Sequence, residues 1–112
     1  MSEPLSAIDE LFFRGDSPTT HQGIASLCLL DSIPDFEALQ RRLPAFLERF
    51  PRLKQRVKDG ATPRWETVVG FDASLQLQLI IDSSITSQEA LLMVASRTFS
   101  QALALDRPLW RF

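Results

Sequence analysis

The hydrophobic pattern of this chain changes from a helical to a strand-like period at Pro51. Before that proline, apolar residues recur at helical spacing behind Asp35, whose carboxylate suits a helix N-cap. We expect Pro44 to kink this helix and Pro51 to end it. After Pro51, Leu53 and Val57 lie among alternating basic residues, as in a β-strand, so the fold must combine both element types. The helical positions are Phe36, Leu39, Leu43, Phe46, Leu47 and Phe50.

The other segments favour a layered α/β or α+β fold in which helices pack on a mixed sheet. A short helix is predicted over residues 4–13, with Pro4 or Ser6 as its start. The apolar run 24–30 is typical of a strand buried on both faces. Thr86 and Glu89 form a capping box that predicts a third helix. Further strands are predicted at 65–69 and 75–81, and at 105–112 leading onward.

The net charge argues against one class of protein, although the basic residues are clustered. A formal net charge of −2 argues against a general nucleic-acid binder, which needs many phosphate contacts. Seven of the twelve Lys and Arg residues lie within 41–58, where they form a solvated face or, alternatively, a surface that attracts anions. These are Arg41, Arg42, Arg49, Arg52, Lys54, Arg56 and Lys58.

The lone cysteine and the lengths of the apolar runs indicate where in the cell the protein is expected. Cys28 has no partner for an internal disulfide, and its leucine neighbours predict a buried thiol. No apolar stretch approaches the roughly 20 residues of a membrane helix. We therefore expect a cytoplasmic protein with at most peripheral contact with a membrane or lipid droplet.

The residues taken alone predict no catalytic set. His21 is the single histidine and has no nearby cysteine with which to form a metal site, so we expect no metal and a structural or solvent-facing role. The four glycines form no phosphate-binding loop, and no nucleophile elbow is present. A nucleophile with its base cannot be assembled from these residues.

Several segments, in order, resemble the bacterial wax ester synthase/acyl-CoA:diacylglycerol acyltransferase family. Residues 4–9 read Pro-Leu-Ser-Ala-Ile-Asp, similar to the Pro-Leu-Ser-x-x-Asp signature that opens the family. The stretch from Ser17 to the strand ending at Asp31 is similar to the family's first strand. Residues 50–57, 63–65, 71–72 and 105–110 continue the resemblance, which covers nearly the whole chain. The link after Asp106 is shorter than in many members, as in condensation-type relatives.

The resemblance implies a chloramphenicol-acetyltransferase-like half domain in the superfamily of CoA-dependent acyltransferases and condensation domains. The family's His-His-x-x-x-Asp-Gly motif, whose second histidine is the general base, follows the segment equivalent to 106–110. Residues 1–112 lack it, so we expect the N-terminal portion of one domain, inactive alone. By resemblance, Pro4, Leu5, Ser6 and Asp9 lie near the acyl tunnel. The alternative is a helix packed on the sheet with Asp9 on its surface.

The implied activity is transfer of a fatty acyl group from acyl-CoA to a long-chain alcohol or diacylglycerol, without a cofactor. Acyl-CoA and the lipid alcohol are then the substrates, and the remainder of the enzyme or a second copy is an expected partner. Arg52, Lys54 and Arg56 are predicted to contact CoA phosphates or an anionic membrane. Two alternatives stay open: a condensation-type enzyme using a carrier-protein thioester, and a non-enzymatic docking or lipid-binding module.

Overall fold

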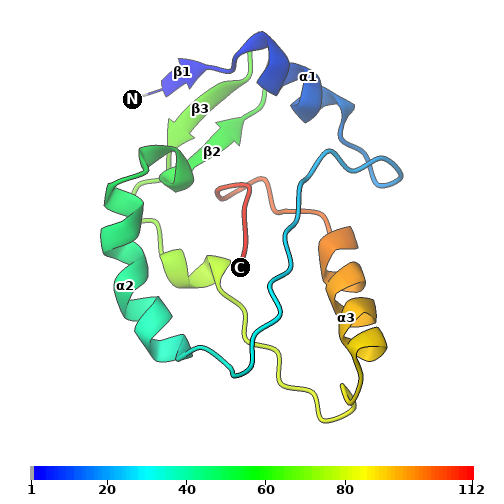
Figure 1. Cartoon of the computed structure of the whole chain (residues 1–112). Coiled ribbons are helices and arrows are strands. Elements are labelled where there is room, and N and C mark those ends of the chain that lie inside the picture. Colours follow the sequence, from blue (N-terminus) through cyan, green and yellow to red (C-terminus); the bar gives the residue numbers. More distant parts are fainter. Residues whose placement is uncertain (1) are drawn as a thin grey trace.

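The computed structural model describes residues 2–112 and shows an α+β arrangement of short elements (Figure 1). Strands β1 (Ser2–Pro4), β2 (Gln55–Lys58) and β3 (Arg64–Thr67) form one sheet in the order β1-β3-β2. Both pairings are antiparallel. The predicted α+β class is confirmed, although the sheet of the described residues is antiparallel throughout and not mixed.

The hairpin of β2 and β3 confirms the strand that alternation predicts after Pro51, but only over Gln55–Lys58, because residues 51–54 form a 3₁₀ turn. Val57 is buried and pairs with Trp65, while Lys58 pairs with Arg64 across the turn. β3 begins one residue before the predicted strand and ends two residues before its predicted end. The hairpin is therefore short, and its apolar face is covered mainly at Val57.

The first helix begins at Ser6, the later of the two predicted starts. Residues 2–4 form β1, and α1 spans Ala7–Gly15. Ser6 is the N-cap, because its hydroxyl accepts a hydrogen bond from the backbone N–H of Asp9 at 3.1 Å. Leu5 is buried, and its backbone N–H donates to the carbonyl of Pro63 at 3.1 Å. These contacts fix the passage from strand to helix.

The second helix follows the prediction closely. α2 spans Phe36–Glu48, and the Asp35 carboxylate accepts a hydrogen bond from the backbone N–H of Ala38 at 3.1 Å. Pro44 lies inside the helix, and a 3₁₀ turn, η1 (Pro51–Lys54), follows it. Leu47 is buried on the face of α2 that meets η1 and η2 (Ala73–Gln76).

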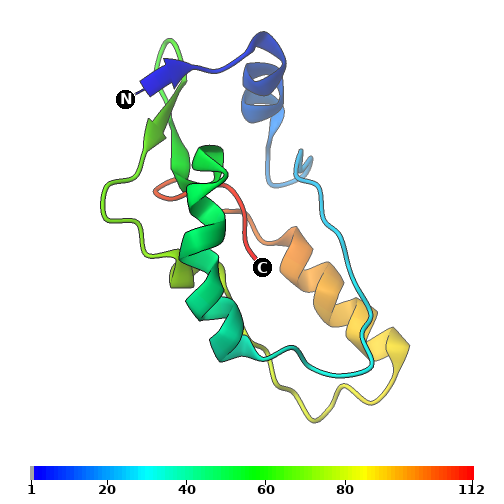
Figure 2. The same cartoon turned by 60° about the vertical axis from the view of Figure 1, so that its left-hand side comes forward.

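The third helix, α3 (Gln88–Ser100), is confirmed, but Thr86 is not its cap. Ser87 takes that position, and its hydroxyl accepts a hydrogen bond from the backbone N–H of Ala90 at 3.1 Å. In both views of the molecule, the extended segment 22–31 runs beside α3 (Figures 1 and 2).

The predicted buried strand at residues 24–30 is wrong. The segment is extended but forms no strand, and Cys28 is exposed, so the prediction of a buried thiol is also wrong. Ile24 is 98% exposed and Leu30 is 64% exposed. Without neighbouring strands to pair its backbone groups and cover its faces, the apolar pattern cannot produce a sheet strand.

The strand predicted at 75–81 is also replaced by other structure. Its first two residues belong to η2, and the rest is extended without strand assignment. The Asp72 carboxylate caps η2 by accepting from the backbone N–H and the hydroxyl of Ser74, at 3.0 and 2.6 Å. This local hydrogen bonding competes with a strand at its N-terminal end.

The molecule is a flat, open frame around the C-terminal segment, as the two views show (Figures 1 and 2). Its dimensions are 47 × 35 × 18 Å, and its Cα radius of gyration is 16.0 Å. A compact domain of this length has a radius near ~13 Å. Its accessible surface of 8743 Å² compares with about 6,200 Å² for a compact protein of the same mass. Much apolar surface is therefore left uncovered.

Candidate functional site

The C-terminal segment, residues 106–112, lies at the centre of the frame and is held by one buried side chain. Gln76 is 2% exposed, and its side-chain amide donates to the backbone carbonyl of Pro108 at 2.8 Å and to that of Trp110. Pro108 is itself buried. A buried amide with its N–H groups satisfied fixes the path of the segment that it contacts.

Three further anchors join this segment to separate elements. The indole Nε1 of Trp110 donates to the carbonyl of Leu53 in η1 at 2.8 Å. The Arg111 guanidinium donates to the C-terminal carbonyls of α3, at Thr98 and at Gln101 (2.7 Å). Arg56 of β2 reaches the carbonyl of Asp106 at 3.3 Å. The segment that resembles the approach to the family's catalytic motif is thus positioned by η1, η2, β2 and α3.

The residues predicted near an acyl tunnel gather at the start of α1. Pro4 pairs with Arg64 in the sheet, Leu5 is buried, and Ser6 caps the helix. Asp9 lies exposed in the first helical turn, where its negative charge interacts favourably with the helix dipole and stabilises the helix. The structure therefore gives Leu5 and Ser6 folding roles and brings all four residues together at one helix end, while their predicted contact with substrate stays a prediction.

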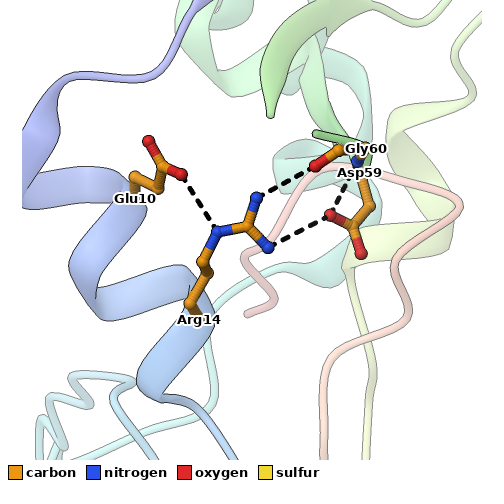
Figure 3. Close-up of polar contacts among 4 residues, drawn as sticks. All are labelled: Glu10, Arg14, Asp59 and Gly60. Atoms are coloured by element: carbon orange, nitrogen blue, oxygen red, sulfur yellow. Dashed lines mark hydrogen bonds and ion pairs between the residues drawn. The ribbon is translucent and has the colours of Figure 1, made fainter. Parts of the chain in front are cut away.

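Arg14 fastens the other end of α1 to the β2–β3 turn (Figure 3). Its guanidinium donates to the carboxylate of Glu10 at 3.0 Å and to the carbonyl of Gly60 at 2.9 Å. The Asp59 carboxylate lies 3.9 Å from the same guanidinium. This fork of contacts fixes α1 on the hairpin and thereby positions the residues at its N-terminus.

Each basic residue predicted to contact an anion already faces a carboxylate. Arg52 lies 2.5 Å from Glu3 and 4.4 Å from the centre of the Trp65 ring. Lys54 lies 2.9 Å from Glu48. Arg56 lies 3.3 Å from Glu66, its partner across the hairpin. Within residues 2–112, the other four basic residues of the cluster form no ion pair, and these are Arg41, Arg42, Arg49 and Lys58.

The described part of the chain presents no assembled catalytic pair. His21 is partly exposed, with Nδ1 3.9 Å from Asp16 Oδ1. No group of three His, Cys, Asp or Glu side chains in residues 2–112 is placed to hold a metal. One hollow lies across a face of the sheet, where Ser2, Lys58 and Arg64 represent the three strands, and another lies between α2 and η2.

Two carboxyl groups at turns outside segment 106–112 have lowered pKa values. Hydrogen bonds from the hydroxyl and then the backbone N–H of Ser74 lower the pKa of Asp72. The corresponding bonds from Ser84 lower the pKa of Asp82, with a smaller contribution from the positive charge of Arg97. Both groups are exposed and serve turn geometry, so the lowered pKa values do not mark a reaction centre.

Gln76 and Arg111 were missed by reasoning from the sequence. The available signal was a glutamine within the apolar alternation of residues 75–81, at a position where a buried polar side chain needs hydrogen-bond partners.

In residues 2–112, no helix has the length and apolar character needed to cross a membrane.

The fold and the anchored segment define an α+β framework in which distant elements position one peptide segment. Two proteins of Mycobacterium tuberculosis, from strains CDC 1551/Oshkosh and ATCC 25618/H37Rv, are similar to this chain. Both bear the name "Putative diacyglycerol O-acyltransferase" and are 30% identical over 115 residues, covering 98% of this chain. The chain is related to the acyltransferase family that its motifs resemble, and that prediction is confirmed.

The chain spans about a quarter of the length of these curated relatives, since the match covers 23% of each. No family model matches the chain. No solved structure matches it. The relation to acyltransferases therefore depends on the sequence match.

Proposed function

We propose that this chain forms part of an O-acyltransferase that moves a fatty acyl group from acyl-CoA to diacylglycerol or a long-chain alcohol. The observation that carries the proposal is the 30% identity to the two mycobacterial proteins over 98% of the chain. The anchored segment 106–112 supports it, because four elements hold the region that resembles the approach to the family's base. Alone, residues 1–112 are proposed to be inactive.

The test is a chimera in which this chain replaces the matched 115-residue region of the H37Rv relative. The chimera, the unaltered relative and the 112-residue chain are assayed with palmitoyl-CoA and either dioleoylglycerol or hexadecanol. We expect transfer by the chimera and none by the chain alone. A folded but inactive chimera beside an active relative contradicts the proposal, and activity in the chain alone contradicts its inactivity. Transfer from a carrier-protein thioester but not from palmitoyl-CoA instead favours the condensation-type alternative.

The start of α1 is proposed to line the acyl path. Leu5 is buried beside Pro4, and Ser6 directs the chain into a helix whose first turn exposes Asp9. In an active chimera, Asp9→Asn is expected to raise the KM for the acyl acceptor. Glu37→Gln, which alters the exposed acid in the first turn of α2, is the matched control. Equal effects from the two variants contradict a specific role for Asp9.

The basic residues Arg52, Lys54 and Arg56 are proposed to contact the phosphates of CoA or of an anionic lipid surface. Because each faces a carboxylate, binding an anion requires exchange of that partner. Charge reversal of the three in an active chimera is expected to raise the KM for palmitoyl-CoA. Reversal of the unpaired residues is the comparison, and those changed are Arg41, Arg42 and Arg49.

Neutral and anionic vesicles separate the two anion sources. Contact with CoA predicts the change in KM without lipid present, whereas contact with lipid predicts lost binding to vesicles containing phosphatidylglycerol. An unchanged KM together with unchanged vesicle binding contradicts the proposed role of these three residues.

A further inference from the structure

Two positive side chains lie directly opposite each other on one face of the sheet. Lys58 of β2 pairs with Arg64 of β3 in the antiparallel register, and we call these two residues the opposed pair. Side chains at directly paired positions lie on the same face, where like charges repel and destabilise the hairpin. The opposed pair therefore costs the hairpin stability unless another group compensates its charge.

Neither member of the opposed pair has a carboxylate partner. The ion pairs of residues 2–112 include neither Lys58 nor Arg64. Arg64 donates to the hydroxyl of Ser2 at 3.2 Å and to the backbone carbonyl of Ser2 at 3.1 Å. Both acceptors are neutral, and Lys58 is exposed, so neither positive charge is compensated within this part of the chain.

The carboxylates near the opposed pair are already engaged by other arginines. Glu66 lies 3.3 Å from Arg56, its partner across the hairpin. Asp59, in the β2–β3 turn, lies 3.9 Å from the guanidinium of Arg14 (Figure 3). These two pairs contribute no net charge, so the local balance is that of the opposed pair, two positive charges.

The opposed pair lines a hollow with a volume of about 200 Å³. One water molecule takes about 30 Å³ in the liquid, so the hollow has room for a phosphate group. Hydroxyl, ammonium and guanidinium groups all line it, and each of these can donate hydrogen bonds to phosphate oxygens. The lining residues are Ser2, Lys58, Asp59, Thr62, Arg64 and Glu66.

We propose that this hollow binds a dianionic phosphate group, as carried by inorganic phosphate and by phosphate monoesters. A phosphate monoester bears a charge of about −1.5 to −2 at pH 7, which matches the two uncompensated positive charges. A phosphate diester bears a single negative charge and compensates only half of them. The site is separate from Arg52, Lys54 and Arg56, none of which lines the hollow. The inference goes beyond the proposed function, because it requires no acyl transfer.

The first test is a titration of the 112-residue chain with inorganic phosphate at constant ionic strength. Amide chemical shifts of Lys58 and Arg64 report binding, and dimethyl phosphate, a diester, is the matched ligand control. We expect saturable shifts with inorganic phosphate and binding of dimethyl phosphate that is weaker by at least about threefold. The absence of saturable shifts with inorganic phosphate overturns the inference, as does equal binding of the two ions.

Lys58→Gln is the principal variant, because Arg64 also holds Ser2 and its replacement disturbs β1. Arg41→Gln is the matched control, since it removes the same charge from an exposed residue without an ion pair in residues 2–112. Phosphate binding is expected to weaken by at least about threefold in Lys58→Gln and to change by less than about twofold in Arg41→Gln. Equal weakening in the two variants overturns the inference.

Urea denaturation at low salt separates ligand binding from a structural role of Lys58. Without phosphate, Lys58→Gln is expected to be at least as stable as the parent, because it removes the repulsion from Arg64. Added phosphate is expected to stabilise the parent more than the variant, because a ligand of the folded state raises its stability in proportion to binding. A Lys58→Gln variant that is less stable than the parent without phosphate shows that Lys58 serves the fold, and overturns the inference.

Two matched ligand pairs distinguish the sources of the phosphate group. CoA and dephospho-CoA differ only in the 3′-phosphate monoester, and vesicles of phosphatidylcholine with phosphatidic acid or phosphatidylglycerol compare a lipid monoester with a lipid diester. Tighter binding of the monoester in one pair supports that source, and equal binding in both pairs beside bound inorganic phosphate supports free phosphate. An inactive chimera with intact phosphate binding removes the proposed function alone, whereas an active chimera without phosphate binding removes this inference alone.

Discussion

The side-chain amide of Gln76 donates a hydrogen bond of 2.8 Å to the backbone carbonyl of Pro108, 32 residues further along the chain. Both residues are buried, and the same amide also reaches the carbonyl of Trp110. A glutamine in η2 thereby determines the path of the C-terminal segment. Residues 106–112 acquire a fixed position through polar contacts, in a molecule whose described apolar core is small.

Replacing Gln76 should release this segment. Gln76→Ala removes the side-chain donor of the Trp110 carbonyl and one of the two donors of the Pro108 carbonyl, which also accepts from the N–H of Trp110 at 2.9 Å. It is expected to lower the free energy of unfolding by about 1–3 kcal/mol. Urea denaturation measures the loss. Gln78→Ala is the control, because Gln78 is exposed and its side chain holds no carbonyl of the segment, and it should stay within about 0.5 kcal/mol of the parent. Equal losses in the two variants would contradict the anchoring role.

Local signals in the sequence predict the elements whose stability is local. The cap at Asp35 and the helical spacing behind it locate α2, and the alternation after Pro51 locates β2. Ser87 shows the limit of this reasoning, because it caps α3, whose start the sequence places at Thr86. One hydroxyl hydrogen bond decides a helix start, and neighbouring Ser and Thr residues compete for it.

Elements that need distant partners are predicted poorly. The apolar run containing Cys28 has the composition of a buried strand, but no strand of the described residues pairs with it. The candidate site likewise combines a segment that the sequence locates with contacts from distant residues that it does not predict. The resemblance locates Asp106 and Trp110 in a meaningful segment, whereas their anchors Arg56 and Gln76 come from distant positions that periodicity does not connect.

Trp110 should couple the segment to η1. Its indole N–H donates to the carbonyl of Leu53 at 2.8 Å, and Trp110→Phe retains an aromatic ring but loses that donor. The expected cost is about 1 kcal/mol, together with faster amide exchange at Phe112. Trp65→Phe is the comparison, because it makes the same indole-to-phenyl change beneath Arg52, outside the segment. Unchanged exchange at Phe112 in Trp110→Phe would show that the indole bond does not hold the segment.

Arg14 should govern the attachment of α1 to the hairpin. Arg14→Gln removes the ion pair with Glu10 and weakens the link to Gly60 and Asp59, shown in Figure 3. Because the side chains are partly exposed and screened, the expected loss of stability is below about 1 kcal/mol and shrinks in high salt. Faster amide exchange throughout α1 is the more sensitive measurement.

Arg41→Gln is the matched control for Arg14→Gln. It removes the same charge from an exposed helical position, without an ion pair among the described residues. Exchange in α1 should stay unchanged in this control. If both variants speed exchange equally, net charge and not the contact with the β2–β3 turn accounts for the effect.

The hydrogen bonds at Asp72 should make its turn sensitive to acid. Ser74 donates through its hydroxyl and its backbone N–H, and these bonds lower the pKa of Asp72 below its usual value of 3.8. A carboxyl group with a lower pKa in the folded state stabilises that state above its unfolded pKa. The contribution disappears as the pH falls through the folded pKa.

Ser74→Ala is therefore expected to raise the pKa of Asp72 and to reduce stability at pH 7 more than at pH 2. A carboxyl chemical-shift titration follows the ionisation, and urea denaturation at both pH values follows the stability. Asp82 is the internal control, because Ser84 donates the equivalent bonds and is unaltered in this variant, so its lowered pKa should persist. A pKa of Asp72 that stays low in Ser74→Ala would contradict the assignment to the hydroxyl. A hydrogen bond to the ionised carboxylate weakens when acid protonates that carboxylate. A stability difference that is the same at both pH values would therefore show that Ser74 stabilises the turn independently of the ionisation of Asp72.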